Sequence, residues 1–190
     1  MTRRLSRRSL LGATAGGIAM ATVGVRPASG ATDDELAYAN FGLAAAFLAA
    51  AYYTRALQAG RLGADARGTL RTGRSASLAQ GRALSELITG AGDTPAAAED
   101  FEFAWPRNAF ATTASTRQTG FDVLRPTLGA YQSAAATVVM PSYRVLYASL
   151  AASLGQQIGA LAGPFGERAE PFPTAMDLEA ASAALESYLG

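Results

Sequence analysis

Residues 40–57 read NFGLAAAFLAAAYYTRAL, within a stretch, residues 36–54, that carries no charged side chain. A segment of this length can span a membrane, form the central helix of a soluble core, or be a helix whose active-site residues have been replaced. Alanines separate its larger side chains, so other helices can pack closely around it. A membrane span usually holds more Leu, Ile and Val, and the acids at 33–35 oppose insertion. The composition therefore favours a central helix of an all-α domain.

The residue types missing from the chain exclude several kinds of chemistry. The 190 residues are enough for one domain with a sizeable core, but they include no Cys, no His and no Lys, so Arg supplies all 16 basic charges. Disulfides, Cys/His zinc sites and histidine acid–base catalysis are excluded, and a serine nucleophile would lack a His or Lys base. An enzyme would depend on Asp, Glu, Ser, Thr, Tyr, Arg or a cofactor.

The first 31 residues have the features of a targeting segment. Residues 6–11, SRRSLL, resemble a twin-arginine export signal, in which an Arg pair precedes a polar and two apolar residues, and a run rich in Gly and Ala follows. We expect cleavage after Ala31. An uncleaved signal would leave residues 9–25 as a membrane tether, and a basic arm for nucleic acid or anionic lipid is the other interpretation.

Cleavage would change the charge of the protein. It removes five Arg and no acid, leaving 11 Arg against 15 acids, a net charge of −4. The mature domain then has no basic stripe that would indicate nucleic-acid binding. Because twin-arginine export generally carries folded proteins, we expect the domain to fold before export and to act in the periplasm, the cell envelope or outside the cell. The predicted organisation is a signal, residues 1–31, and one domain, residues 32–190.

Gly and Pro divide the rest of the chain into helices, and no alternating run of polar and β-branched residues predicts a strand. Four long helices and a short C-terminal one predict an all-α, four-helix bundle. The predicted long helices cover residues 33–59, 68–89, 114–138 and 141–162.

Local signals set the ends of these helices. Thr32 and Glu35 form a capping box for the first helix, which Gly60 ends. Pro126 should kink the third helix or split it. Thr174 and Asp177 form a second capping box for the short helix, which should end near residue 189.

Several short stretches resemble one family, the exported bacterial ferritin-like domain proteins, which are related to plant desiccation-related proteins. The resemblance covers most of residues 33–163 and implies a ferritin-like bundle. The stretches are NFGL (40–43) and YYTRAL (52–57) in the first helix, FEFA (101–104) and NAF (108–110) in the inter-helix loop, and LGAY (128–131) with Ala134 and Ala135 in the third helix.

The resemblance also implies where a dimetal site would lie. Ferritin-like sites take a Glu from each of two helices and a Glu-x-x-His pair from each of the other two. None of the corresponding positions here holds a carboxylate or an imidazole. They are Ala46 and Ala49 on the first helix, Ser77 and Gln80 on the second, Leu124 on the third, and Leu154 and Gln157 on the fourth.

The supply of acids leads to the same conclusion whatever the alignment. After Glu35 the first helix has no acid, the second has only Glu86, the third only Asp122 and the fourth none. Four inward carboxylates cannot be assembled, and hard or borderline metals need anionic oxygen or imidazole ligands. We therefore expect no metal, no cofactor and no catalytic residue; residues that would bind another cofactor are unknown from the sequence.

Gln80 and Gln157 stand where the His ligands would be. Each amide donates and accepts, so we hypothesise that the two side chains hydrogen-bond to one another across a repacked core. The alternative is that both face solvent.

Three other groups of residues allow two interpretations each. Loop residues 101–110, with the sole Trp at 105, cover an apolar end of the bundle or form an interaction surface, and we favour the cover. Arg67, Arg71 and Arg74 lie on a solvated face or bind an anion, and we favour the solvated face. The tyrosines belong to the core, which we favour, or line a small-molecule pocket: Tyr38, Tyr52, Tyr53, Tyr131, Tyr143 and Tyr147.

Three classes of function remain. The leading one is a non-catalytic exported bundle that has lost its metal site and acts through binding, or as a structural or stress-associated protein. The second is an enzyme or small-molecule binder that uses a non-metal pocket in the bundle. The third is a membrane-tethered interaction module that retains its signal. The partner is an unknown protein or small molecule, not nucleic acid, and self-association into a homo-oligomer is compatible with all three.

Overall fold

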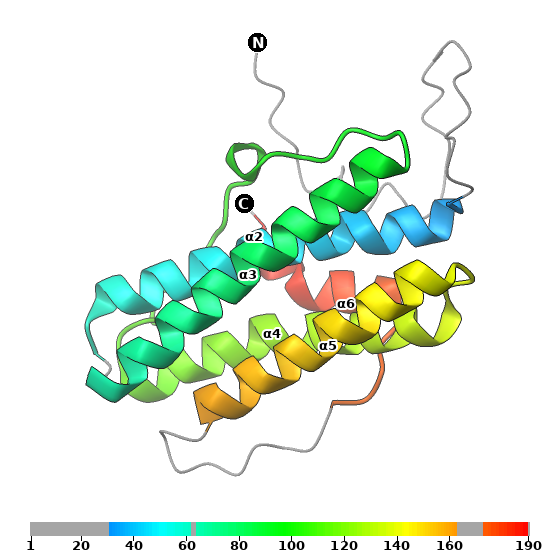
Figure 1. Cartoon of the computed structure of the whole chain (residues 1–190). Coiled ribbons are helices and arrows are strands. Elements are labelled where there is room, and N and C mark those ends of the chain that lie inside the picture. Colours follow the sequence, from blue (N-terminus) through cyan, green and yellow to red (C-terminus); the bar gives the residue numbers. More distant parts are fainter. Residues whose placement is uncertain (1–30, 62–63, 163–172, 190) are drawn as a thin grey trace.

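The computed structural model describes residues 31–61, 64–162 and 173–189, which fold into helices and connecting loops (Figure 1). The predicted all-α class is confirmed for this part of the chain, where the one β pairing is an isolated bridge between Phe103 and Leu189. Of the predicted signal, residues 1–31, all but Ala31 lie outside the described residues. The elements are α2 (Asp33–Ala59), α3 (Ala64–Gly90), η1 (Ala98–Asp100), α4 (Thr113–Thr137), α5 (Pro141–Ala162), α6 (Leu178–Leu185) and η3 (Glu186–Tyr188).

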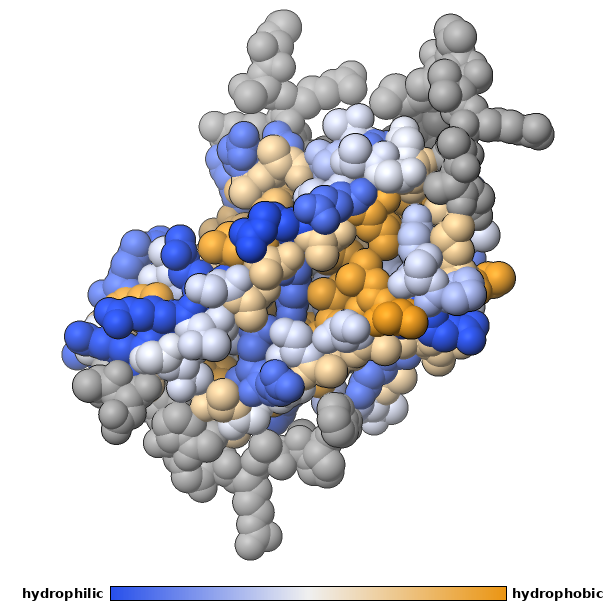
Figure 2. Space-filling model, viewed as in Figure 1, coloured by the Kyte–Doolittle hydropathy of each residue, from blue (hydrophilic) through white to orange (hydrophobic). Residues whose placement is uncertain are grey.

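The four long helices pack around one core. α2 lies against α3 and α4, α5 lies against α4 and α3, and α6 packs mainly on α4 (Figure 1). Among neighbouring long helices, α3 and α5 are the least closely packed pair. Figure 2, drawn from the side on which these two helices lie, shows apolar surface gathered between them.

The ends of α2 follow the local sequence. The Thr32 hydroxyl accepts from Glu35 N at 3.2 Å, and Glu35 Oε2 accepts from Thr32 N at 2.9 Å, so the predicted capping box is present. Gly60 ends the helix with φ of 64°, a conformation that Gly adopts at little cost. The bounds of α2 and α5 are those that the sequence predicted.

The other two long helices differ from the prediction. α3 begins at Ala64, not at residue 68, because Ala66 and Leu70 are buried and their packing favours a helix through Gly68. α4 continues through Pro126, so splitting it there is wrong. Pro126 is itself buried, and packing along the helix outweighs a penalty of about 3 kcal/mol for an interior proline.

The predicted capping box at Thr174 is also wrong. The N-cap of α6 is Asp177, whose carboxylate accepts from Ala180 N at 2.7 Å. Just before it, Met176 N donates to the carbonyl of Gly129 on α4 at 3.0 Å. This bond holds the chain extended across α4, so the helix cannot begin three residues earlier.

The tyrosines lie in the core, which is the interpretation that the sequence analysis favoured. Tyr52, Tyr53, Tyr131, Tyr143 and Tyr147 are buried, and Tyr38 packs against the core. Several of their hydroxyls donate to backbone carbonyls of neighbouring elements: Tyr52 to Thr116 at 3.0 Å, Tyr131 to Gly42 at 3.2 Å and Tyr147 to Glu35 at 3.0 Å. Burial raises the pKa of each of these three phenols, so all three are neutral donors at ordinary pH.

Two of the described helices, α2 and α5, are long and apolar enough to cross a membrane by length and composition alone. Most of the apolar window of α2 is buried against other helices, as in the core helix of a soluble protein, whereas less than half of the window of α5 is buried.

The long loop between α3 and α4 runs along the bundle and meets the C-terminal segment (Figure 1). Ala104 N donates to the carbonyl of Tyr188 at 2.9 Å, and the ring of Trp105 lies 5.7 Å from that of Tyr188. Phe103 and Trp105 are half-buried against the core. The loop therefore covers apolar surface, as favoured.

Candidate functional site

The positions that the resemblance assigns to metal ligands are all buried. They come from four different helices and carry methyl, isobutyl, hydroxyl and amide groups. These residues are Ala46 and Ala49 of α2, Ser77 and Gln80 of α3, Leu124 of α4, and Leu154 and Gln157 of α5. Exposure of Gln80 and Gln157 is only 6% and 7%, so the solvent-facing alternative for these two amides is wrong.

A hydrogen-bonded network joins three helices at these positions. Tyr53 Oη donates to Gln157 Oε1 at 3.0 Å, and Ser77 Oγ donates to the same oxygen at 3.4 Å. One amide oxygen of α5 thus accepts from both α2 and α3. Such an arrangement satisfies a buried carbonyl without introducing a charge.

The two glutamines meet at a serine rather than at one another. Gln80 Nε2 donates to Ser153 Oγ at 3.1 Å, and Gln157 Nε2 donates to the same Oγ at 3.4 Å. The hypothesis of a direct bond between the amides is therefore wrong. Ser153 lies one turn before Gln157 on α5, where its short side chain leaves room for Gln80 to reach across from α3.

Sequence reasoning did not assign a role in this network to Tyr53 or Ser153. Burial raises the pKa of the Tyr53 phenol, so it acts as a neutral donor. The ring fits because α3 carries Gly73 beside it: a methyl group there would lie 2.7 Å from the Tyr53 hydroxyl oxygen. A Tyr on one helix and a Gly on the next can be recognised as a contacting pair only when it is known that the two helices pack together.

A cleft of about 370 Å³ opens beside this network, between α3 and α5. Its described lining carries no formal charge and offers hydroxyl and amide groups. The lining residues are Tyr53, Thr69, Thr72, Gly73, Ala76, Ser153, Gln156, Gln157 and Ala160. These groups suit an uncharged molecule that donates and accepts hydrogen bonds.

Glu35 is the buried acid among the residues described, and it serves the fold. Its Oε1 accepts from the backbone N–H of Val139 at 3.1 Å and of Met140 at 2.8 Å, in the turn between α4 and α5. Burial raises the pKa of Glu35, but these bonds and those from Thr32 outweigh it, so the pKa lies below the ordinary 4.5. The carboxylate holds the start of α2 against that turn.

Two further acids of the long helices lie outside the core. Glu86 of α3 and Asp122 of α4 are exposed, and Asp122 accepts from Gln118 at 2.7 Å. Within the described residues there is no group of three or more acids that could hold a metal ion. Arg67, Arg71 and Arg74 are exposed, as favoured, and Arg74 Nε donates to Thr54 at 3.0 Å.

Comparison of the chain with protein-family models, with curated proteins and with solved structures finds no match.

Proposed function

We propose that this protein is a non-catalytic, exported, ferritin-like helical bundle that has lost its dimetal carboxylate site and acts through binding, or as a structural or stress-associated protein. One observation carries the proposal. The positions where the family pattern would place metal ligands are buried on four helices, yet they hold apolar, hydroxyl and amide side chains that pack and hydrogen-bond. Export is supported by the twin-arginine-like motif at residues 6–11.

The replacement is favourable on physical grounds. Several carboxylates facing one another in a core without metal repel and lose hydration, so an empty carboxylate site destabilises a bundle. Ala46, Ala49 and Leu124 remove that cost. The amide of Gln157 retains a polar link among α2, α3 and α5 at no cost in buried charge.

Metal content tests the proposal. After loading with ferrous iron and manganese and removal of free metal, elemental analysis of the purified protein should find less than about a tenth of an equivalent, because no anionic ligand set is available. The thermal midpoint should not change with either metal, since a bound ion would raise it. One or two tightly held equivalents would overturn the proposal.

A pair of histidine variants tests whether these positions converge as a ferritin-like site requires. The Gln80 and Gln157 amide nitrogens both lie within 3.4 Å of Ser153 Oγ, so Gln80→His with Gln157→His should place two imidazoles together and bind Zn²⁺. The matched control is Gln80→His with Gln156→His, because Gln156 is the exposed neighbour. Equal zinc binding by the two pairs would contradict the assignment.

A further inference from the structure

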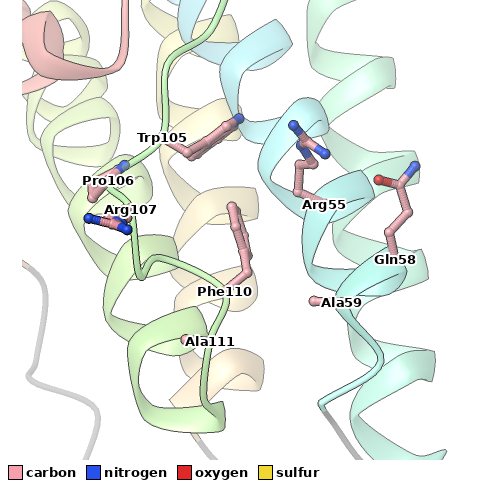
Figure 3. A pocket seen from close by; sticks show the side chains of 8 residues that line it. All are labelled: Arg55, Gln58, Ala59, Trp105, Pro106, Arg107, Phe110 and Ala111. Atoms are coloured by element: carbon pink, nitrogen blue, oxygen red, sulfur yellow. The ribbon is translucent and has the colours of Figure 1, made fainter.

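A second cavity, of about 530 Å³, lies away from the Gln157 network, between the C-terminal end of α2 and the loop before α4 (Figure 3). One wall is aromatic, formed by Trp105 and Phe110, and the opposite wall is the last two turns of α2. The lining residues are Arg55, Gln58, Ala59, Trp105, Pro106, Arg107, Phe110 and Ala111. The described lining thus contains two Arg and no acid.

The aromatic wall is fixed from behind. Trp105 and Phe110 meet edge to face at 5.3 Å, and Phe110 stacks on buried Tyr52 at 6.1 Å. The turn between them is closed by a bond from Ala109 N to the Pro106 carbonyl at 2.9 Å. A wall held in this way loses little conformational freedom when a ligand binds.

Two unpaired donors face each other across the mouth of the cavity. Figure 3 shows the indole nitrogen of Trp105 directed toward the guanidinium of Arg55, with open space between them. Neither the indole N–H nor this guanidinium has a hydrogen-bond or ion-pair partner among the residues described. Arg107 lies on the other side of the aromatic wall from Arg55 (Figure 3).

We propose that this cavity binds a small aromatic carboxylate, with its ring against Trp105 and Phe110 and its carboxylate accepting from Arg55 and the indole N–H of Trp105. A guanidinium and a second N–H together match the two oxygens of a carboxylate, and charged hydrogen bonds are stronger than neutral ones. A cavity of this volume accommodates a ligand with one or two rings. The site is separate from the replaced metal site and does not depend on the ferritin-like assignment.

The sole Trp of the chain makes the test direct, since Trp105 fluorescence reports this cavity alone. The probe is phenylacetate, titrated into the full chain, with phenylacetamide as its uncharged analogue and acetate as an anion without a ring. Phenylacetate should give a saturable fluorescence change and shift the single indole N–H resonance. Phenylacetamide should bind about tenfold or more weaker, because it lacks the charged bond to Arg55, and acetate should give no saturable change.

Two arginine variants and a control variant test which guanidinium binds the carboxylate. Arg55→Gln should weaken phenylacetate binding about tenfold, whereas Arg107→Gln should have a much smaller effect. Arg71→Gln, an exposed residue of α3 that does not line the cavity, is the matched control and should leave binding unchanged. All three positions are exposed, so each variant should keep the thermal midpoint of the parent.

The proposal is overturned if phenylacetate changes neither the fluorescence nor the indole resonance in a saturable way. It is also overturned if Arg55→Gln binds phenylacetate as tightly as the parent chain, or if phenylacetamide binds as tightly as phenylacetate. A change that Arg71→Gln reduces as much as Arg55→Gln would indicate general anion adsorption to surface arginines instead of binding in this cavity.

Discussion

Buried polar side chains bond to the backbone in one region of the core and to other side chains in another. In the first region, which we call the backbone-bonded region, Tyr52, Tyr131 and Tyr147 donate to carbonyls of other helices and Glu35 accepts from backbone N–H groups. In the second, which we call the side-chain network, Tyr53, Ser77, Gln80, Ser153 and Gln157 bond to one another.

The difference matters because a backbone partner does not depend on which residue supplies it. Tyr52 bonds to the Thr116 carbonyl whatever side chain position 116 carries, so this region sets the spacing of α2 and α4. A network of side chains changes whenever one member changes, and it lies at the loosely packed α3–α5 interface beside a cleft. Substitutions are most easily tolerated in such a region.

The largest expected effect is a loss of stability when one methyl group is added in the backbone-bonded region, and the same change in the side-chain network should cost less. A Cβ at Gly120 of α4 would lie against the Tyr52 hydroxyl and 2.6 Å from Leu161 Cδ2, in closely packed core. Gly120→Ala should therefore lower the free energy of unfolding by about 1–3 kcal/mol. Gly73→Ala crowds Tyr53 in the same way, but the adjoining cleft gives that ring space, so its cost should be smaller. Urea unfolding measures both.

Gly159→Ala on α5 is the matched control for this comparison. No heavy atom lies within 4 Å of its added Cβ, so the better helix propensity of Ala should stabilise the protein by up to about 1 kcal/mol. If Gly73→Ala were as costly as Gly120→Ala, the two interfaces would be equally rigid and the comparison would fail.

Acid should weaken only the backbone-bonded region. Because the pKa of Glu35 is below its ordinary value, its stabilisation is fully present above the unfolded-state pKa near 4.5 and is lost as the pH falls through the folded-state value. Glu35→Gln should cost about 1–3 kcal/mol at pH 7 and should reduce the loss of stability between pH 5 and pH 3. Thermal unfolding across this pH range, for the parent and the variant, measures the difference.

Gln157→Leu serves as the control for the acid experiment, because the side-chain network holds no group that titrates in this range. Its pH dependence should parallel that of the parent chain. Retention of the full acid sensitivity in Glu35→Gln would mean that other carboxylates cause it.

The smallest expected effect is a coupling within the side-chain network. Tyr53→Phe and Gln157→Leu remove the two ends of one hydrogen bond, so the double variant should be more stable than the sum of the singles predicts by about 0.5–1 kcal/mol. Tyr131→Phe with Gln157→Leu shares no bond and should be additive. Additivity in both pairs, measured by urea unfolding, would show that the network residues act independently.

Local sequence signals were sufficient to predict most helix ends. A capping box, a Gly in the left-handed conformation and a Pro in the first turn each act within a few residues, and they located α2 and α5 correctly. The errors occurred where a distant contact outweighed the local signal. Burial of Ala66 and Leu70 extended α3 toward its N-terminus, packing kept α4 intact at Pro126, and the bond from Met176 to Gly129 delayed α6.

For the candidate site, the residue types could be predicted but the partners could not. That positions 80 and 157 carry amides can be read from the sequence alone. The bonds they make required the structure, because Tyr53 and Ser77 lie 104 and 80 residues from Gln157 along the chain. The cavity between Arg55 and Trp105 also required the structure, since its walls come from two segments that no sequence pattern connects.

The sequence by itself determined that this chain is helical and where its first helix begins and ends. It also determined that the chain contains no His and no Cys. These properties depend on residue identity and on neighbours a few positions away. Only the tertiary structure decided that Ser153 joins the two glutamines, that Tyr53 rests against Gly73, and that Arg55 faces Trp105. Each of these depends on how helices distant in the chain pack, and packing is decided by the shapes of all the side chains together.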